Sequence, residues 1–177
     1  MNIHGKLGFF LGVFLLMVCF GGFIYINVIL RCPFKQQCEV HLKRAATAPT
    51  IELAKQELAM AIEYLEKNSL THGYTSVFGN RSSEDIGYWY RSLKEAHLSL
   101  SNIGNDVSQS DKAIVLWNLR QTLLDDDGDV VFPEGIHKYP HNKIYFGILF
   151  LCALLWFPGI GLLAYVWSET DLNKAKG

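Results

Sequence analysis

The chain has 177 residues, of which 50% are hydrophobic and 19% are charged, and its formal net charge is only −1. This charge balance excludes a basic nucleic-acid-binding protein, which needs clustered cations to displace phosphate counterions, so no nucleic acid is expected as a partner. The high apolar content excludes a disordered acidic chain. Because the apolar residues are concentrated at both ends, the sequence predicts an integral membrane protein.

Two charge-free apolar runs, residues 7–30 and 144–167, predict transmembrane helices in a lipid bilayer. Each run would form a helix about 36 Å long, enough to cross a hydrocarbon core of about 30 Å. A soluble chain of this length cannot bury two such rods on all sides, which argues against core helices. A cleaved signal peptide has a much shorter apolar region than residues 7–30. Short tails, residues 1–6 and 168–177, would flank the two spans on one side of the membrane.

The spans themselves carry few features that point to a function. Gly8 and Gly12 form a GxxxG pair that would allow a second helix backbone to approach closely, and Pro158 predicts a kink in the second span. Apart from tyrosine phenols, the thiols of Cys19 and Cys152 are their only ionisable groups. Because ion and proton pathways normally need such groups, a transporter or selective channel is disfavoured.

The segment between the spans, residues 31–143, predicts a small three-helix domain, which makes the whole protein all-α. Pro49 and Thr50 suit the start of a first helix, and Asn68 with Ser69 suits its end. Its apolar positions form a heptad seam over two heptads, which is too short to predict a free-standing coiled coil. These positions are Ile51, Ala54, Leu58, Ala61 and Leu65. Residues 39–47 are expected to be a helical extension of the first span.

Two further helices are indicated by start signals. The pattern Ser82-x-x-Asp85 predicts a second helix, whose apolar side would carry Ile86, Tyr90, Leu93, His97 and Leu100. The pattern Ser108-x-x-Asp111 predicts a third, with Ile114, Trp117 and Leu124 on its apolar side. A loop is expected between the first two helices.

The orientation in the membrane rests on two conflicting signals. Positive charges flanking the spans favour a cytosolic domain, but connections of this length translocate largely regardless of such charges. Cys32 and Cys38 lie just beyond the first span, and a turn between them would bring their Cα atoms close enough for a disulfide. Such a bridge implies an oxidising compartment, so we expect an extracytoplasmic domain and cytoplasmic termini; two unpaired thiols are the alternative.

The most specific local motif resembles a calcium-binding loop. Asp125, Asp127, Asp129 and Glu134 follow part of the EF-hand spacing, and their carboxylates would converge on a hard cation, making calcium a possible cofactor. Leu123, however, occupies the position of the first ligand. The alternative is an acidic, solvated turn at the end of a helix.

Histidines offer a weaker case for metal binding or catalysis. His137 and His141 have the spacing of a zinc pair on a helix, but Pro140 lies between them and no third ligand is apparent. They are better interpreted as histidines at the membrane interface. His97 falls on the apolar side of the second predicted helix, where a hydrogen-bonded boundary residue is expected rather than a catalytic base.

Three consecutive aromatic residues, Tyr88, Trp89 and Tyr90, lie on the second predicted helix. Successive helical residues fan over about 200°, so one core-facing stripe cannot bury all three rings. At least one ring should reach solvent, lipid headgroups or a partner protein, which makes these residues candidates for partner binding. The alternative is a helix that is packed on two sides.

No spacing in the sequence couples a nucleophile to a base, and the phosphate-binding and metalloprotease motifs are absent, so an enzyme is not expected. The leading hypothesis is an accessory, assembly or stabilising subunit whose domain binds another protein or a second copy. Alternatives are a ligand- or cation-sensing domain acting through a separate partner, and an oligomeric membrane-permeabilising protein. In outline the architecture resembles the sensory half of chemoreceptor-like proteins, which implies signalling through such a partner.

Overall fold

The computed structural model describes residues 3–104 and 107–174, with side chains omitted for residues 3–7, 159, 162–163, 165–166 and 168–174. These residues form helices and turns without strands, apart from isolated bridges that pair Tyr74 with Asp85 and Leu124 with Val130. The expected all-α class is therefore confirmed. The chain divides into two compact units, Met1–Ile29 with Lys143–Gly177, and Leu30–Asn142.

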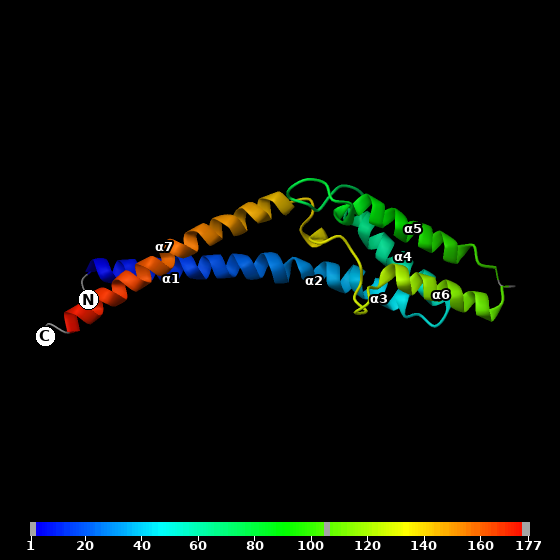
Figure 1. Cartoon of the computed structure of the whole chain (residues 1–177), viewed down its shortest axis with the longest axis horizontal. Helices are drawn as coiled ribbons and strands as arrows, with labels where there is room; N and C mark the ends of the chain where they lie inside the picture. The colour runs from blue at the N-terminus through cyan, green and yellow to red at the C-terminus, as the bar shows by residue number, and fades with distance from the viewer. Residues whose placement is uncertain (1–2, 105–106, 175–177) are drawn as a thin grey trace. The chain divides into compact units, whose positions relative to one another are not determined.

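The first unit consists of two long helices, α1 (Ile3–Ile24) with a π-helical turn η1 (Tyr25–Ile29), and α7 (Asn142–Lys174) (Figure 1). Inside this unit the Cys19 thiol donates to the backbone oxygen of Cys152 at 3.5 Å, so the two helices are in contact. The α7 helix continues through Pro158 and extends beyond the expected start of the tail at residue 168.

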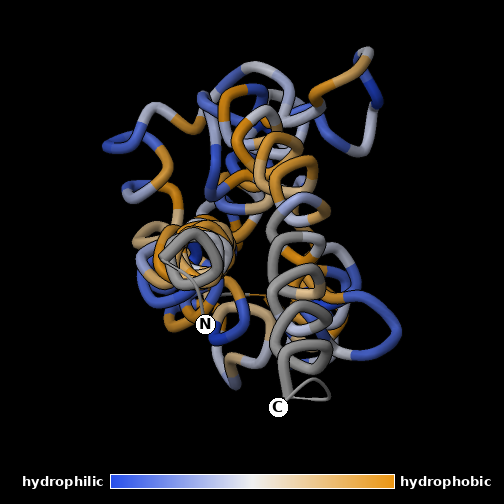
Figure 2. Tube along the Cα trace, turned by 90° about the vertical axis from the view of Figure 1, so that its left-hand side faces the viewer, coloured by the Kyte–Doolittle hydropathy of each residue, from blue (hydrophilic) through white to orange (hydrophobic). Residues whose placement is uncertain are grey.

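The described helical stretch Gly8–Ala46 is long and apolar enough to cross a membrane, and only 11% of its most apolar window is buried. Figure 2 colours the described parts of α1 and α7 largely as hydrophobic. A core helix of a soluble protein would bury most of this surface, so the exposed apolar side chains favour a lipid environment. The described apolar part of α7, Asn142–Pro158, is shorter than a membrane span requires.

The second unit opens with helical segments that continue the chain beyond the first apolar run. These are α2 (Arg31–Phe34), a π-helical turn η2 (Lys35–Glu39) and α3 (Val40–Ala46), and they agree with the helical extension expected over residues 39–47. This extension is part of the core, because Phe34, Cys38, Leu42, Ala45 and Ala46 are buried. The domain therefore contains one helical layer more than the three helices expected from the sequence.

The central helix of the domain is α4 (Ile51–Lys67), which packs against both α3 and α5. The Thr50 hydroxyl accepts a hydrogen bond from the Leu53 backbone N–H at 3.3 Å, and Asn68 is the C-cap residue, as predicted. Ser69 follows with a positive φ of 57°, which ends the helix. Every position of the expected heptad seam is buried. The apolar periodicity therefore identified the face of α4 that forms the core.

The next helix is α5 (Ile86–Ser101), and its cap, Asp85, lies three residues later than the predicted cap, Ser82. Ser82 lies instead in a short 3-10 turn, η3 (Ser82–Glu84), and the Asp85 carboxylate caps the helix by accepting from the Tyr88 N–H at 3.0 Å. Both residues are good caps by type. Asp85 is the cap because its backbone is extended and pairs with Tyr74, which fixes the point at which the helix begins.

The last helix of the domain, α6 (Gln109–Leu123), begins at the predicted Ser108 cap, whose hydroxyl accepts from the Asp111 N–H at 3.2 Å. Its expected apolar side was wrong for Ile114 and Trp117, which are 56% and 59% exposed, whereas Leu124, the C-cap residue, is buried in the core. The buried side carries Leu119 and Leu123, with Val115 and Leu116 partly buried. The helix has apolar residues on two sides, and α3 packs against the side that carries Leu119 and Leu123.

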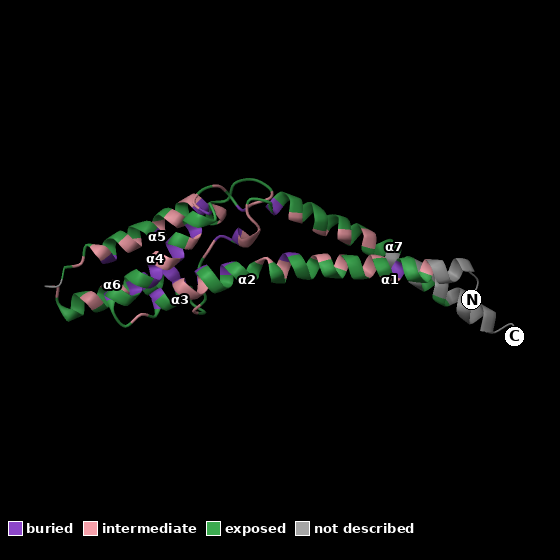
Figure 3. Ribbon diagram, turned by 180° about the vertical axis from the view of Figure 1, so that it is seen from behind, coloured by how far each residue is buried: buried purple, intermediate pink, exposed green. Residues whose placement is uncertain are grey.

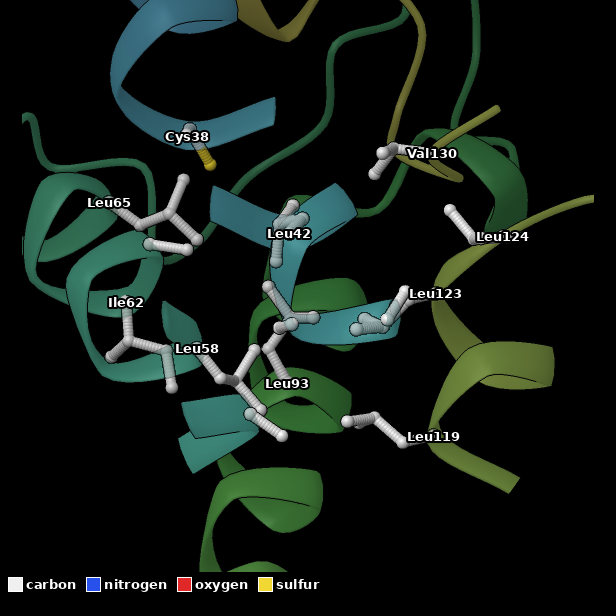
Figure 4. Packing of buried hydrophobic residues seen from close by; sticks show 14 of the residues in the cluster. Cys38, Leu42, Leu58, Ile62, Leu65, Leu93, Leu119, Leu123, Leu124 and Val130 are labelled. Carbon is white, nitrogen blue, oxygen red and sulfur yellow. The ribbon is translucent and has the colours of Figure 1, made fainter. Parts of the chain in front are cut away.

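The core of the domain gathers aliphatic side chains from α3, α4, α5 and α6 (Figure 4). Figure 3 shows this buried centre in purple, in contrast to the exposed surface of the long apolar helices. The Phe34 ring packs edge-on against Tyr64 and Phe132, with centroid distances of 6.2 and 5.1 Å. A short 3-10 helix, η4 (Ile136–Lys138), precedes the start of α7.

Candidate functional site

The acidic segment after α6 forms a tight turn. The carboxylate of Asp125 accepts hydrogen bonds from the backbone N–H groups of Asp127 and Asp129, at 3.1 and 2.8 Å. Gly128 adopts a positive φ of 79°, which allows Leu124 and Val130 to pair across the turn. The first of the proposed ligands is therefore used to hold the backbone of its own loop.

This geometry does not assemble the calcium site that the sequence suggested. Asp129 forms an exposed ion pair with Lys43 at 3.5 Å, and Glu134 is exposed. Among the residues that the structure describes, no three His, Cys, Asp or Glu side chains are grouped so that they could hold a metal ion. The arrangement matches the alternative, a solvated acidic turn at a helix end, because the carboxylates do not converge.

Cys32 and Cys38 are both free thiols in the structure, so the expected disulfide is not formed. They lie on consecutive helical segments, α2 and η2, with Cys32 exposed and Cys38 fully buried. Six residues of helix separate them by about 9 Å along the axis, beyond the reach of a disulfide. Burial raises the pKa of Cys38 to about 12, and Glu39 adds to the shift, so this thiol is unreactive.

The three aromatic residues at the start of α5 have different environments. Tyr88 is 64% exposed, whereas Trp89 is half-buried and its indole N–H donates to the Val131 backbone oxygen at 2.9 Å. The Tyr90 hydroxyl donates to the Glu66 carboxylate, which also accepts from Lys94 at 3.3 Å. Both hydrogen bonds lower the pKa of Glu66, and the one from Tyr90 has the larger effect. One ring of the three is thus left available for a partner, and two hold the domain together.

Two large apolar side chains are exposed on the solvent side of α6. Ile114 and Trp117, three residues apart, project from the same side of the helix and form what we call the outer α6 face. Their flanking positions Ser110 and Gln121 are exposed and polar. Large apolar groups at the centre of a polar, exposed helix surface are typical of binding sites, because burial against a partner removes them from water.

No histidine whose side chain the structure describes is grouped with two further His, Cys, Asp or Glu side chains that could hold a metal ion with it. Burial lowers the pKa of His137 to about 4, with Lys138 and Arg31 adding to the shift. His97 is half-buried, and its pKa is lowered by burial and then by Lys55. Both findings agree with neutral boundary histidines, and the environment of His137 explains why it would be a poor proton carrier near neutral pH.

A different histidine, His41, joins two core helices. Its Nδ1 atom lies 2.6 Å from Oε2 of Glu57, with His41 on α3 and Glu57 on α4. Glu57 is among the few buried charged residues of the domain, and this bond provides the partner that a buried carboxylate needs. We assign the pair a structural role, because the nearby Cys38 thiol is too deeply buried to act as a nucleophile.

The loop between α4 and α5, residues 69–85, is closed at its base by backbone pairing. The Thr75 N–H donates to the Glu84 oxygen at 3.0 Å, and the Ile86 N–H donates to the Gly73 oxygen at 2.9 Å. Gly73 has a φ of 99°, and a Cβ atom there would lie 2.3 Å from the Tyr139 hydroxyl. The base of the loop is therefore pressed against the segment that leads into α7.

The expected helix-packing glycines lie on α1. Gly12 is buried and Gly8 is half-buried, although the neighbouring residues Phe9, Phe10 and Leu11 are exposed. Packing of a second helix backbone against Gly8 and Gly12 stays a prediction.

No protein-family model, no curated protein and no solved structure matches the chain. Two candidate sites were not predicted from the sequence: Ile114 and Trp117 were expected on the apolar side of their helix, and Phe78 in the α4–α5 loop was not singled out. A large aromatic residue directly before a glycine turn, in an otherwise polar loop, was the available signal for Phe78.

Proposed function

We propose that the protein is a non-enzymatic, two-span membrane protein whose helical domain binds another protein, as an accessory, assembly or stabilising subunit. The proposal rests on the outer α6 face. Ile114 and Trp117 expose large apolar side chains to water there, and exposed apolar surface of this kind is typical of a binding site. Tyr88, exposed on the neighbouring helix α5, is a second candidate contact.

The two spans are supported by the apolar character of α1 and α7 and by their contact at Cys19 and Cys152. Both termini would then lie on one side of the membrane and the domain on the other. With the Cys32 and Cys38 thiols unpaired, no disulfide supports an extracytoplasmic position of the domain. A topology reporter inserted at Gly104, which lies in an exposed loop, would assign the compartment.

The partner that fits the outer α6 face is a protein presenting an apolar helix or groove with a polar rim. Affinity capture of the full chain from mild detergent should recover such a partner in fixed stoichiometry. Replacing Trp117 by Ala should weaken the complex by roughly 30-fold or more, since truncated aromatic anchors typically cost about 2 kcal/mol or more. Leu98→Ala, an equally exposed apolar position on α5, is the matched control.

Two results would contradict the proposal. The first is a chain that remains a monomer without a bound protein in every detergent tried. The second is a complex that survives Trp117→Ala and Ile114→Ala together, because the apolar face would then not be the binding surface.

A further inference from the structure

The tip of the α4–α5 loop exposes a large aromatic side chain. Phe78 is 73% exposed, and Tyr74 at the base of the loop is 40% exposed. Gly79 follows Phe78 with a φ of 73°, so the chain turns directly after the ring. A protruding loop with a phenylalanine at its tip carries a free-energy cost in water and is favoured at an apolar boundary.

The position of this loop relative to the bilayer follows from chain continuity. The Tyr139 hydroxyl lies against Gly73, and the second apolar run begins at Ile144, five residues after Tyr139. Five residues span at most about 17 Å of extended chain. If residues 144–167 enter the bilayer, the base of the loop must lie close to the headgroup region, which is several ångströms thick on each side of the hydrocarbon.

The loop also has the composition of a membrane-interface anchor. Arg81 and Asn80 are exposed beside the aromatic tip, and His72 is exposed at its base. Aromatic rings at the level of the headgroups, accompanied by a cation whose charge remains in water or on lipid phosphate, are typical of residues that anchor a domain to a membrane surface. Figure 1 shows the loop, in green, at the same end of the Leu30–Asn142 unit as the yellow segment that leads to α7.

We propose that the tip of the α4–α5 loop, through Phe78 and with Arg81 beside it, inserts into the headgroup layer of the bilayer that holds the protein. This inference rests on the proposed two-span topology. The inserted loop is a third attachment point of the domain, in addition to the two covalent connections at Leu30 and Asn142. Three points define a plane, so the loop would fix the tilt of the domain on the membrane.

The test uses the full chain in lipid nanodiscs, in a background in which Trp156 and Trp167 are replaced by Phe, and the emission of this background, which keeps Trp89 and Trp117, is subtracted. Phe78→Trp is compared with Leu98→Trp, an exposed position twelve residues into α5 and therefore about 18 Å from its start at Ile86. We expect lipid carrying bromine near the headgroups to quench the added Trp at position 78 several-fold more than the one at position 98. Emission from position 78 should also shift to shorter wavelength.

A chain that retains Trp156, on the apolar helix α7, reports separately on the span. If bromine deep in the acyl chains quenches Trp156 while the residue at position 78 is quenched no more than that at position 98, the loop proposal is overturned and the two-span proposal stands. If neither is quenched, the span itself is refuted and the loop proposal fails with it. A second variant, Phe78→Asp, should lose binding of the loop to the bilayer without unfolding, because the position is exposed; increased protease cleavage within residues 76–83 would show this release.

Discussion

The burial of Leu58 leads to the most quantitative prediction about the domain. Leu58 is fully buried in α4, where Figure 4 shows it beside Leu93. Truncating it to Ala removes apolar contacts and leaves a cavity, which typically costs about 2–5 kcal/mol. This loss should raise the population of opened domain between about 30-fold and a few thousand-fold, since each 1.4 kcal/mol is a factor of ten. Leu53→Ala on the same helix is the matched control, because Leu53 is 40% exposed.

The rate of cysteine labelling measures this opening in the full chain, without requiring that the membrane helices unfold. Cys38 is buried among the core residues and reacts only when the domain opens, whereas Cys32 is exposed and reacts at once. Peptide-resolved mass spectrometry after a timed pulse of alkylating reagent separates the two thiols. We expect Leu58→Ala to accelerate labelling of Cys38 in proportion to the opening equilibrium, and Leu53→Ala to change it by less than about threefold.

Two outcomes would refute this reasoning. If Leu53→Ala and Leu58→Ala accelerate labelling equally, α4 does not bury the side assigned to the core. If Cys32 and Cys38 react at the same rate in the unaltered chain, the first helical extension does not pack into the domain. If both thiols resist alkylation until a reductant is added, Cys32 and Cys38 form a disulfide after all.

Three further predictions follow from individual contacts. Asp85→Ala should destabilise the domain by about 1 kcal/mol in chemical denaturation followed by Cys38 labelling, whereas Ser82→Ala should have little effect, because the Asp85 carboxylate caps α5. The folded domain holds the pKa of His137 near 4, below its unfolded value of about 6.5. Stability should therefore fall as the pH is lowered from about 6.5 to 4, and His137→Gln should reduce this fall. Calcium titration should leave Trp117 fluorescence unchanged, because Asp125 already accepts two backbone N–H groups; a saturable change would contradict this reading of the turn.

Where one apolar stripe dominated, the sequence predicted the fold well. The heptad positions of α4 are all buried, and the caps at Thr50 and Ser108 accept the expected backbone hydrogen bonds. These features are local: a side chain and a backbone group three residues away determine them. Predicting a helix in the apolar run at the start of the chain likewise required only its length and composition. The structure shows a continuous helical stretch over Gly8–Ala46.

Predictions that depended on tertiary contacts failed. Residues 113–117 of α6 are apolar on both sides of the helix, and only the packing of α3 decides that Ile114 and Trp117 face outward. The start of α5 shifted from Ser82 to Asp85 because Asp85 pairs with Tyr74 in the preceding loop, a contact that the sequence does not reveal. The spacing of Cys32 and Cys38 suggested a bridge only on the assumption of a turn, and the chain there is helical.

The close approach of Tyr139 to Gly73 has a consequence for how this protein can diverge during evolution. Two independent constraints act on position 73: its positive φ disfavours any residue with a side chain, and the phenol ring of Tyr139 occupies the space that a methyl group would need. A smaller residue at position 139 would remove only the second constraint. Homologous chains should therefore keep glycine at position 73 even where the tyrosine has been lost, and should lose the glycine only together with a rearranged loop.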